Sequence, residues 1–548
     1  MLRPLLILFS LCGACGGIDT LDGSTDPDAS DGASDAASDA ASDAASDAAS
    51  DAAADASSED SAVADVGVDA FHDAESGDTT DSGESMDAGD GMVSTIRTFT
   101  PASLNLLHLS RDPDQLVFGD MDVSHEAGFV ALVGGFKGTL NEDGVAPVTS
   151  RDPGMEGFLF WRETDRASSL FRWGGSGTTI FRTVEFPPGD GRTGKVTVAG
   201  ELDGMIATRF TSATSDGIDG FFGVTHLYDE GSCCRSDISF TQFEIVRSTG
   251  YSSTRALRHK SHLIFTGGTF EGDTWFGVRR IAAGTRDGFV ESVHDDPYNA
   301  TSFYRVTTHG TTSLDPVHGL EAVRAIGYAW NRNDYFAGGV ISNGTDTDLW
   351  LARYEYVPPV PHRFVEISHE WSPSIPGHQD ISDIDDDELR NCFVGSFENA
   401  LVLDDFSIEG TPHAAAYLAC VSNSGSPVEV VTTLAAESAV HGLSVAMEGP
   451  NIYVGGTYEA DMRVGDIVLE HAGERDGFVV QFELTDSAGA FELVPVAAYA
   501  VSTASDDTIE AVGVLSGRLF VAGILGRPHS FRGGVRAMNR GVFLLKLE

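Results

Sequence analysis

The chain has 548 residues, with 83 acidic and 34 basic side chains and a formal net charge of −49 at pH 7. This balance argues against DNA or RNA as a partner, because nucleic-acid binding depends on neutralising phosphates with Lys and Arg. It also argues against attachment to an anionic membrane surface by charge alone.

Residues 1–14 are predicted to be a signal peptide. The chain begins MLRPLLILFSLCGAC, with one basic residue, Arg3, followed by an apolar run and then small residues. The apolar run is too short to span a bilayer and fits a secretory signal that is removed. We therefore expect an exported protein.

The tract LCGAC at residues 11–15 resembles the bacterial lipobox. The resemblance implies that Cys15 becomes the lipid-modified first residue of the mature chain and that its acyl chains hold the protein to a membrane. Because Gly16 follows in place of Asp, the resemblance implies the bacterial outer membrane, with a surface-exposed or periplasmic position. The alternative is an ordinary signal peptide and soluble release.

Residues 15–93 form a linker built on SDAASDAASDAASDAASDAAADASSED. From residue 16 onward the linker contains 22 acidic side chains and no Lys or Arg. Low hydrophobicity and charge of one sign cannot bury enough surface to fold, so we predict a disordered acidic tether. The competing interpretation is an Ala-rich helix, but Asp at every fourth position would stack like charges on one helix face.

Residues 94–548 contain a repeated unit. Its first marker is a small residue after an apolar strand, and the marker recurs at intervals of 57 to 71 residues. A second marker, acidic-Gly-Phe, follows most copies, and one more apolar run follows that. The first marker falls at Gly135, Gly200, Gly268, Gly339, Ser396, Gly456 and Gly523. The additional runs are residues 168–173, 240–246, 303–308, 362–368, 428–433 and 491–497.

Each unit therefore holds about four strands, and no helical periodicity is seen. Long repeats of four strands predict an all-β fold, a seven-bladed β-propeller in which stacked neighbours bury each small sheet. The last copy ends without its outer strand, and residues 94–103 are expected to supply that strand beside residues 541–547. Such closure by the two chain ends removes an exposed sheet edge. The alternatives are an open β-solenoid or two sandwiches.

Two of the repeated units resemble a known bacterial repeat family. The segments TFEGDTWFGVRRIAAGTRDGFVESV (269–293) and TYEADMRVGDIVLEHAGERDGFVVQF (457–482) resemble the SBBP-type (bacterial β-propeller) repeat of secreted and surface proteins. The resemblance covers nearly all of residues 94–548 and implies the fold. It implies no activity, because that family shares no catalytic motif.

Four cysteines are left once Cys12 and Cys15 are assigned to the signal and the lipid. Cys392 opens the second strand of the fifth unit and Cys420 lies late in its third strand, so antiparallel pairing favours a disulfide between them. Cys233 and Cys234 form a loop pair, which is either a vicinal disulfide or two thiols. No Cys or His spacing matches a zinc site.

Histidines stand near the start of several innermost strands. Aligning the units there brings His318, His378 and His441 to matching positions, with Asp507 in the seventh unit. If innermost strands line a central channel, these side chains could form a binding site at its mouth, and whether that site takes a metal is left open. The alternative is that each His caps its own turn. The acidic run DIDDDE (383–388) is interpreted as a solvated turn rather than a metal site.

The sequence contains no nucleophile elbow, zinc-protease motif, P-loop or dinucleotide fingerprint, and it indicates no cofactor. We therefore expect a lipid-anchored envelope propeller that binds a carbohydrate or protein ligand, in the manner of an adhesin or scaffold, without catalysis. The alternative is a propeller lyase or glycosidase acting on an envelope or extracellular polysaccharide. Glu321 and Asp380 are the candidate carboxylates for that chemistry. The oligomeric state is not indicated.

Overall fold

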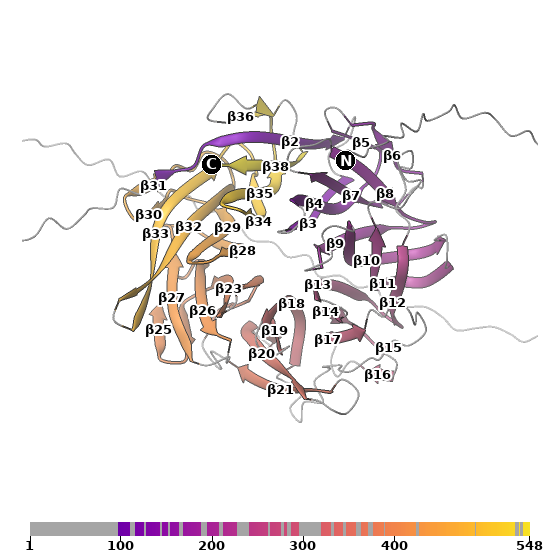
Figure 1. Cartoon of the computed structure of the whole chain (residues 1–548), viewed down its shortest axis with the longest axis horizontal. Helices are drawn as coiled ribbons and strands as arrows, with labels where there is room; N and C mark the ends of the chain where they lie inside the picture. The colour runs from indigo at the N-terminus through magenta and orange to yellow at the C-terminus, as the bar shows by residue number, and fades with distance from the viewer. Residues whose placement is uncertain are drawn as a thin grey trace, which may run out of the picture. The chain divides into compact units, whose positions relative to one another are not determined.

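The structure is a computed structural model. It describes residues 97–109, 115–124, 128–142, 145–151, 154–163, 168–187, 194–207, 212–226, 240–260, 263–275, 279–281, 286–294, 319–329, 334–342, 347–357, 363–370, 376–387, 389–423, 427–487, 489–531, 536–537 and 541–548. Every secondary-structure element in these ranges is a β-strand, and the strands form seven blades around an axis (Figure 1). No helix that could cross a membrane occurs in the described ranges. The predicted β-propeller is confirmed.

The blades are antiparallel sheets whose strands follow chain order from the axis outward, except that the N-terminal strand is outermost in blade seven. Blade one contains β3 (Leu116–Ser124), β4 (Phe129–Phe136), β7 (Glu156–Glu163) and β8 (Ser168–Trp173). Blade two contains β9 (Thr179–Glu185), β10 (Lys195–Ala207), β11 (Ser212–His226) and β12 (Phe240–Ser248). Blade three contains β13 (Ser252–Lys260), β14 (Leu263–Phe270) and β17 (Asp287–His294), and its predicted outer strand, 303–308, lies outside the described residues.

The remaining blades repeat this order. Blade four contains β18 (Gly319–Ala329), β19 (Asp334–Ser342), β20 (Thr347–Val357) and β21 (Arg363–Glu370). Blade five contains β22 (Asp383–Asp386), β23 (Arg390–Phe397), β26 (Ala415–Ser422) and β27 (Val428–Leu434). Blade six contains β28 (Val440–Glu448), β29 (Asn451–Tyr458), β32 (Asp476–Ser487) and β33 (Ala490–Val501). Blade seven contains β34 (Thr508–Leu515), β35 (Arg518–Leu525), β38 (Gly541–Leu547) and β2 (Pro101–Leu109).

Short two-stranded ribbons extend from several blades. They are β5 (Thr139–Asn141) with β6 (Val148–Thr149), β15 (Asp273–Trp275) with β16 (Arg279–Ile281), β24 (Ala400–Leu403) with β25 (Phe406–Glu409), β30 (Met462–Val464) with β31 (Ile467–Leu469), and β36 (His529–Ser530) with β37 (Arg536–Ala537). Each ribbon lies between the second and third strands of its blade in the chain.

The seven innermost strands form the ring. Each of β3, β9, β13, β18, β22, β28 and β34 contacts the next, and β34 contacts β3 to complete the circle (Figure 1). Because each innermost strand pairs with only one strand of its own sheet, its other edge faces the axis. Side chains on these strands are therefore the ones that seven blades can bring together.

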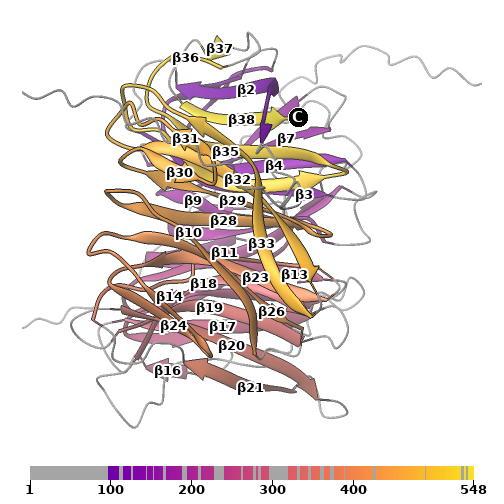
Figure 2. The same ribbon diagram turned by 90° about the vertical axis from the view of Figure 1, so that its left-hand side faces the viewer.

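The two ends of the propeller chain close the ring. The N-terminal strand β2 pairs antiparallel with the C-terminal strand β38, from Pro101 opposite Leu547 to Leu107 opposite Val542 (Figures 1 and 2). This confirms the predicted closure but corrects the strand, which begins at Pro101 rather than at residue 94. Leu107 of β2 is fully buried in this position. The preceding β1 (Arg97–Thr98) instead pairs in parallel with β33 of blade six.

The core lies between the blades. Val394 and Leu418 of blade five share one buried cluster with Val454 and Val480 of blade six. Each sheet is therefore covered on both faces, which is why its inner strands are continuous apolar runs rather than alternating ones. All eight residues of β4, for example, are buried.

Candidate functional site

One glycine on the second strand of every blade packs against the innermost strand. A Cβ atom added to Gly456 would lie 2.0 Å from the carbonyl oxygen of His441. The same approach, between 1.9 and 2.1 Å, recurs in all seven blades and leaves no room for any side chain. These glycines are Gly134, Gly200, Gly268, Gly339, Gly395, Gly456 and Gly523.

Two positions of the predicted marker are thereby corrected. In blade one the equivalent residue is Gly134, not Gly135, and in blade five it is Gly395, not Ser396. Each marker consists of two adjacent small residues, such as Gly134-Gly135. The sequence does not show which of the two faces the carbonyl of the innermost strand, and only the strand pairing decides it. All seven copies therefore keep the glycine, and the fifth blade does not depart from the pattern at this position.

The glycine coincides with a β-bulge in the innermost strand. In six blades the register skips one residue beside the glycine, as between Thr254 and Ala256 in blade three. A bulge gives its strand an extra residue and re-aims that side chain. The bulged residues are Gly119, Arg182, Arg255, Arg324, Leu443 and Glu510. In blade five Ser382, which donates its N–H to Val394, holds the corresponding place.

Three bulged arginines from consecutive blades form what we call the arginine rim: Arg182, Arg255 and Arg324. Their side chains are 26%, 48% and 41% exposed. Arg182 donates to both carboxylate oxygens of Glu201 at 3.0 Å, and Arg324 pairs with Asp380. Because the three residues share one register position, they lie at one level along the axis.

Glu201 is the carboxylate around which two of these arginines gather. The Arg255 guanidinium lies 3.6 Å from it, and the Tyr251 and Ser253 hydroxyls donate to it at 3.0 and 2.7 Å. Burial raises the pKa of Glu201, but the hydrogen bonds and charge of Arg182 outweigh that effect, so the pKa is lowered. Glu201 is thus held as an ionised acceptor within the rim.

Further along the same strands lies a layer rich in carboxylates. Asp120 in β3 accepts hydrogen bonds from the Thr183 hydroxyl at 2.9 Å and the Val184 N–H at 3.2 Å in blade two. Asp383 in β22 accepts from the Ser444 hydroxyl and the Val445 N–H of blade six, both at 2.9 Å. These carboxylates satisfy N–H groups on the free edge of the neighbouring innermost strand.

The interpretation of the acidic run DIDDDE as a solvated turn is therefore wrong. Residues Asp383–Asp386 form β22, the innermost strand of blade five. Asp385 repeats the role of Asp383 one step along, accepting the Met447 N–H at 2.8 Å. The free strand edge needs acceptors, so acidic residues are favoured where sequence patterns usually place apolar ones.

A single arginine, Arg258 of β13, crosses this layer. Its Nη2 atom lies 2.6 Å from Asp386 Oδ1 and 3.2 Å from Asp385 Oδ1, and its Nε lies 3.6 Å from Glu185. It thereby connects blades two, three and five. We call the whole group the acidic layer; it consists of Asp120, Asp122, Glu185, Asp383, Asp385 and Asp386, with Arg258.

Burial perturbs the acidic layer strongly. It raises the pKa of Asp120 to about 7, with a further rise from the charge of Asp383. Burial also raises the pKa of Asp383 and of Asp386 to about 6, and that of Glu185 well above its usual range despite the nearby Arg258. Within the described part of the chain, no group of three or more His, Cys, Asp or Glu side chains is placed to hold a metal ion.

The described members of the predicted histidine site do not share one register position. His378 is exposed, precedes β22 and lies 3.3 Å from the Thr347 hydroxyl. His441 lies in β28 with its Nδ1 3.3 Å from the Ser396 hydroxyl of blade five. The repeated glycine sets the equivalent positions at Asp380, His441 and Thr508, so His378 stands two residues earlier.

Asp507 stands one residue before the equivalent position and is fully buried. It accepts the Gly526 N–H at 2.9 Å, and burial raises its pKa. Among the residues that the structure describes, no hydrogen bond joins two of His378, His441 and Asp507. The interpretation that each polar group serves its own turn or its neighbouring blade fits these contacts.

Several predicted residues fall outside the described ranges: Cys15, Cys233, Cys234 and His318. Of the two candidate carboxylates for catalysis, Glu321 lies in β18 without a described side chain. Asp380 accepts the Ser396 N–H at 2.8 Å and pairs with Arg324. It therefore lies beside the arginine rim.

The predicted disulfide is confirmed. Cys392 and Cys420 face each other directly across β23 and β26, with their Cα atoms 4.1 Å apart, and they are bonded. Both residues are fully buried. The bond joins the second and third strands of blade five.

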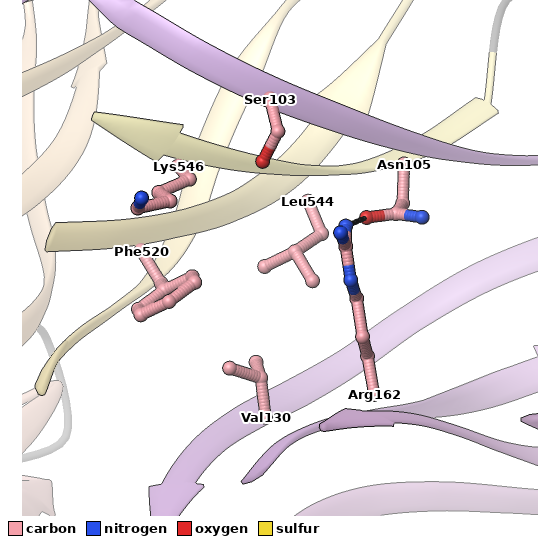
Figure 3. Close-up of a pocket in the computed structure, with 7 residues that line it drawn as sticks. All are labelled: Ser103, Asn105, Val130, Arg162, Phe520, Leu544 and Lys546. Atoms are coloured by element: carbon pink, nitrogen blue, oxygen red, sulfur yellow. Dashed lines mark hydrogen bonds between the residues drawn. The ribbon is translucent and has the colours of Figure 1, made fainter. Parts of the chain in front are cut away.

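A pocket lies where the ring closes between blades seven and one (Figure 3). Its apolar wall is made by Val130, Phe520 and Leu544. Arg162 of blade one extends to Asn105 on β2 and donates a hydrogen bond to it. We interpret this contact as part of the closure, since it ties the N-terminal strand to the first blade.

The arginine rim was not found from the sequence. Its signal is an Arg within each of three innermost strands, TIFRTVE, SSTRALRHK and GLEAVRAIGYA, the second of which also holds Arg258. The distance from each Arg to the repeated glycine differs between blades, because the hairpins between them differ in length. Alignment at the glycine therefore does not superpose them.

Comparison with known proteins gives no family. No protein-family model and no curated protein matches the chain. Among solved structures, Sqt1 from Chaetomium thermophilum is 13% identical with a TM-score of 0.31 and covers 60% of this chain and 77% of its own. The periplasmic gluconolactonase of Pseudomonas aeruginosa is 11% identical with a TM-score of 0.37, over 81% of this chain and 99% of its own. The leech intramolecular trans-sialidase is 8% identical with a TM-score of 0.36, over 84% and 70%. Similarities this low carry no argument about function.

Proposed function

We propose that this chain is a lipid-anchored envelope protein whose propeller binds a ligand without transforming it. The observation that carries the proposal is the arginine rim. Three partly exposed guanidinium groups stand at one level of consecutive blades. The propeller as a whole, residues 94–548, has 61 acidic and 33 basic side chains. A local cationic surface on an acidic body supports selective recognition rather than general charge attraction.

The anchor and the tether complete the proposal. Lipid on Cys15 would hold the protein to the outer membrane, and the acidic linker up to residue 93 would set the propeller away from the bilayer. As a flexible coil the linker spans about 50 Å, and self-repulsion extends it further. This arrangement suits a surface-exposed binding protein whose ligand is an extracellular carbohydrate or protein.

The anchor is tested by growing cells that express the chain with a clickable palmitate analogue. We expect wild-type protein to incorporate the analogue and to fractionate with membranes, and the Cys15→Ala variant to do neither. Incorporation that survives the substitution would contradict lipidation at this residue.

Binding is tested with the full-length chain in detergent against a panel of envelope and extracellular polysaccharides and cell-surface proteins. We expect saturable binding of at least one member, with the ligand recovered unchanged. Failure to bind any member would contradict the proposal.

A second candidate function is catalysis on a polysaccharide, and the acidic layer is the observation that favours it. Asp120 and Asp383 come from blades one and five, interact electrostatically and have raised pKa values. Carboxyl groups with such pKa values are candidates for general acid chemistry near neutral pH. New reducing ends or unsaturated products in the panel, lost in Asp120→Asn, would support this function over simple binding.

A further inference from the structure

We propose that the arginine rim binds the carboxylate of an acidic, uronate-containing saccharide. The inference rests on the proposed binding function and names the chemical class of its ligand. Three features support this ligand: the guanidinium N–H donors of the rim, the asymmetry of the ring of bulged residues and the exposed carboxylate beside Arg324.

The rim presents guanidinium donors that are only partly used by the protein. Among the described residues, Arg255 donates its Nε to Ser253 at 3.2 Å and lies 3.6 Å from Glu201. Arg324 uses its Nη1 for Asp380. Each guanidinium carries five N–H donors in a planar fork that fits a carboxylate with two parallel hydrogen bonds. Both side chains are nearly half exposed, so these donors can reach a ligand.

The ring of bulged residues is cationic on one side only. Blades two to four contribute the three arginines, whereas blades five, six and seven contribute Ser382, Leu443 and Glu510 at the same level. A ligand that lies across the ring would therefore place its anionic group toward blades three and four. The uncharged remainder would lie toward the opposite blades, which fits a ligand with one acidic group per unit.

The acceptor beside Arg324 favours a saccharide over an acidic peptide. Asp380 lies beside Arg324, and its side chain is 23% exposed. Glu201 is buried and already accepts hydrogen bonds from Arg182, Tyr251 and Ser253, so it orients the arginines rather than the ligand. An exposed carboxylate accepts hydrogen bonds from ligand hydroxyl groups and repels a ligand with dense negative charge. A uronate unit offers one carboxylate for the arginines and several hydroxyls for Asp380, while a poly-glutamate peptide offers no hydroxyls.

The test measures binding of an oligogalacturonate to the full-length chain by calorimetry. A neutral galacto-oligosaccharide of the same length and a poly-glutamate peptide of the same charge serve as comparison probes. We expect the oligogalacturonate to bind and both comparison probes to bind at least about tenfold more weakly. Arg255→Gln and Arg324→Gln should each weaken it about tenfold, as loss of a charged hydrogen bond predicts.

Arg518→Gln is the control. Arg518 is exposed and interacts with the charge of Glu548, but it begins β35 at the opposite end of that strand from Gly523 and the bulge. We expect this variant to bind like the wild type. Arg255→Lys, which keeps the charge but loses the fork, should weaken binding nearly as much as Arg255→Gln. Unchanged thermal unfolding would show that each variant is folded.

Three outcomes would overturn the inference: no binding of oligogalacturonate at millimolar concentration, equal binding of the neutral or peptide probe, or an equal loss in Arg518→Gln. Binding of a neutral glycan or a protein that the rim substitutions leave unchanged would also overturn it. That last result would leave the proposed binding function standing, whereas failure of every ligand in the wider panel would contradict the function itself.

Discussion

At the scale of single residues, the repeated glycine and the carboxylates of the acidic layer shape the centre of the ring. Gly456 leaves room for the carbonyl of His441, and the bulge that this contact accompanies aims the neighbouring side chain of the innermost strand. Asp120 and Asp383 occupy the free edges of innermost strands, where they accept N–H groups that no strand pairs. One residue type thus shapes the rim and the other stabilises the ring around the axis.

Gly456→Ala should destabilise the propeller by about 2 kcal/mol or more, because the new methyl group would overlap a backbone carbonyl that cannot move without breaking its strand. Urea unfolding gives the measurement. Gly217→Ala is the control, since its nearest atom would be 3.6 Å away, an ordinary contact. Equal midpoints for the two variants would show that the close approach has no energetic consequence.

The pH dependence of stability follows from the raised carboxyl pKa of Asp120. Its ordinary value is 3.8 and its folded value about 7, so between these pH values the folded chain holds a proton that the unfolded chain has released. The contribution of Asp120 to stability is therefore fully present below about pH 4 and is lost as the pH rises to about 7, a change of about 4 kcal/mol for this residue alone. The raised pKa values of Asp383, Asp386 and Glu185 act in the same direction.

We expect urea unfolding to give a lower stability at pH 8 than at pH 5 and Asp120→Asn to reduce that difference. The exposed Asp405→Asn is the control and should leave the difference intact. A stability that rises from pH 5 to pH 8 would contradict the assignment.

At the scale of elements, the innermost strand and the strand behind it form the working unit. The second strand of each blade leaves space for a carbonyl group through its glycine, and the innermost strand contains the bulge. The position of a side chain at the axis therefore depends on both strands. Blade five adds a covalent link between its second and third strands through Cys392 and Cys420. That blade also places Asp380 beside the arginine rim and Asp383 in the acidic layer, so the disulfide holds strands behind both groups.

Removing the disulfide should lower stability by about 2–4 kcal/mol, because the cross-link closes a loop of 28 residues in the unfolded chain. The paired substitution Cys392→Ala with Cys420→Ala gives the measurement by thermal unfolding. The substitution also leaves a small cavity. Unfolding the wild-type protein with and without a reductant measures the effect of the bond without that cavity. Identical transitions in both experiments would mean that the bond is dispensable for the blade.

At the scale of the whole molecule, stability depends on closure of the ring. Strand β2 fills the outer place in blade seven, buries Leu107 and brings Asn105 to Arg162 of blade one (Figure 3). Without it, the edge of β38 and the apolar surface between blades seven and one would be exposed. An exposed edge strand of this kind promotes aggregation.

Two deletions separate the tether from the closing strand. Deleting residues 16–93 should leave the unfolding transition of the propeller unchanged. Deleting residues 16–109 should give aggregated or unfolded protein, as measured by size-exclusion chromatography and circular dichroism. A folded monomer after the longer deletion would show that closure by β2 is not required.

The sequence by itself determined the architecture. The number of copies, the order of strands within a copy, the missing seventh outer strand and the pairing of Cys392 with Cys420 all follow from local patterns that repeat. Repetition makes such predictions strong, because one pattern seen seven times outweighs the ambiguity of any single strand.

Only the tertiary structure decided which side chains meet at the axis. His378 and His441 looked equivalent in sequence, yet the strand pairing separates them by two positions, and Arg255 and Arg324 looked unrelated, yet they share one position. The acidic run of β22 looked solvated and proved to be an innermost strand. The physical reason is that hairpin length and one-residue bulges set the register between blades, and neither is constrained by the apolar pattern that a sequence reveals.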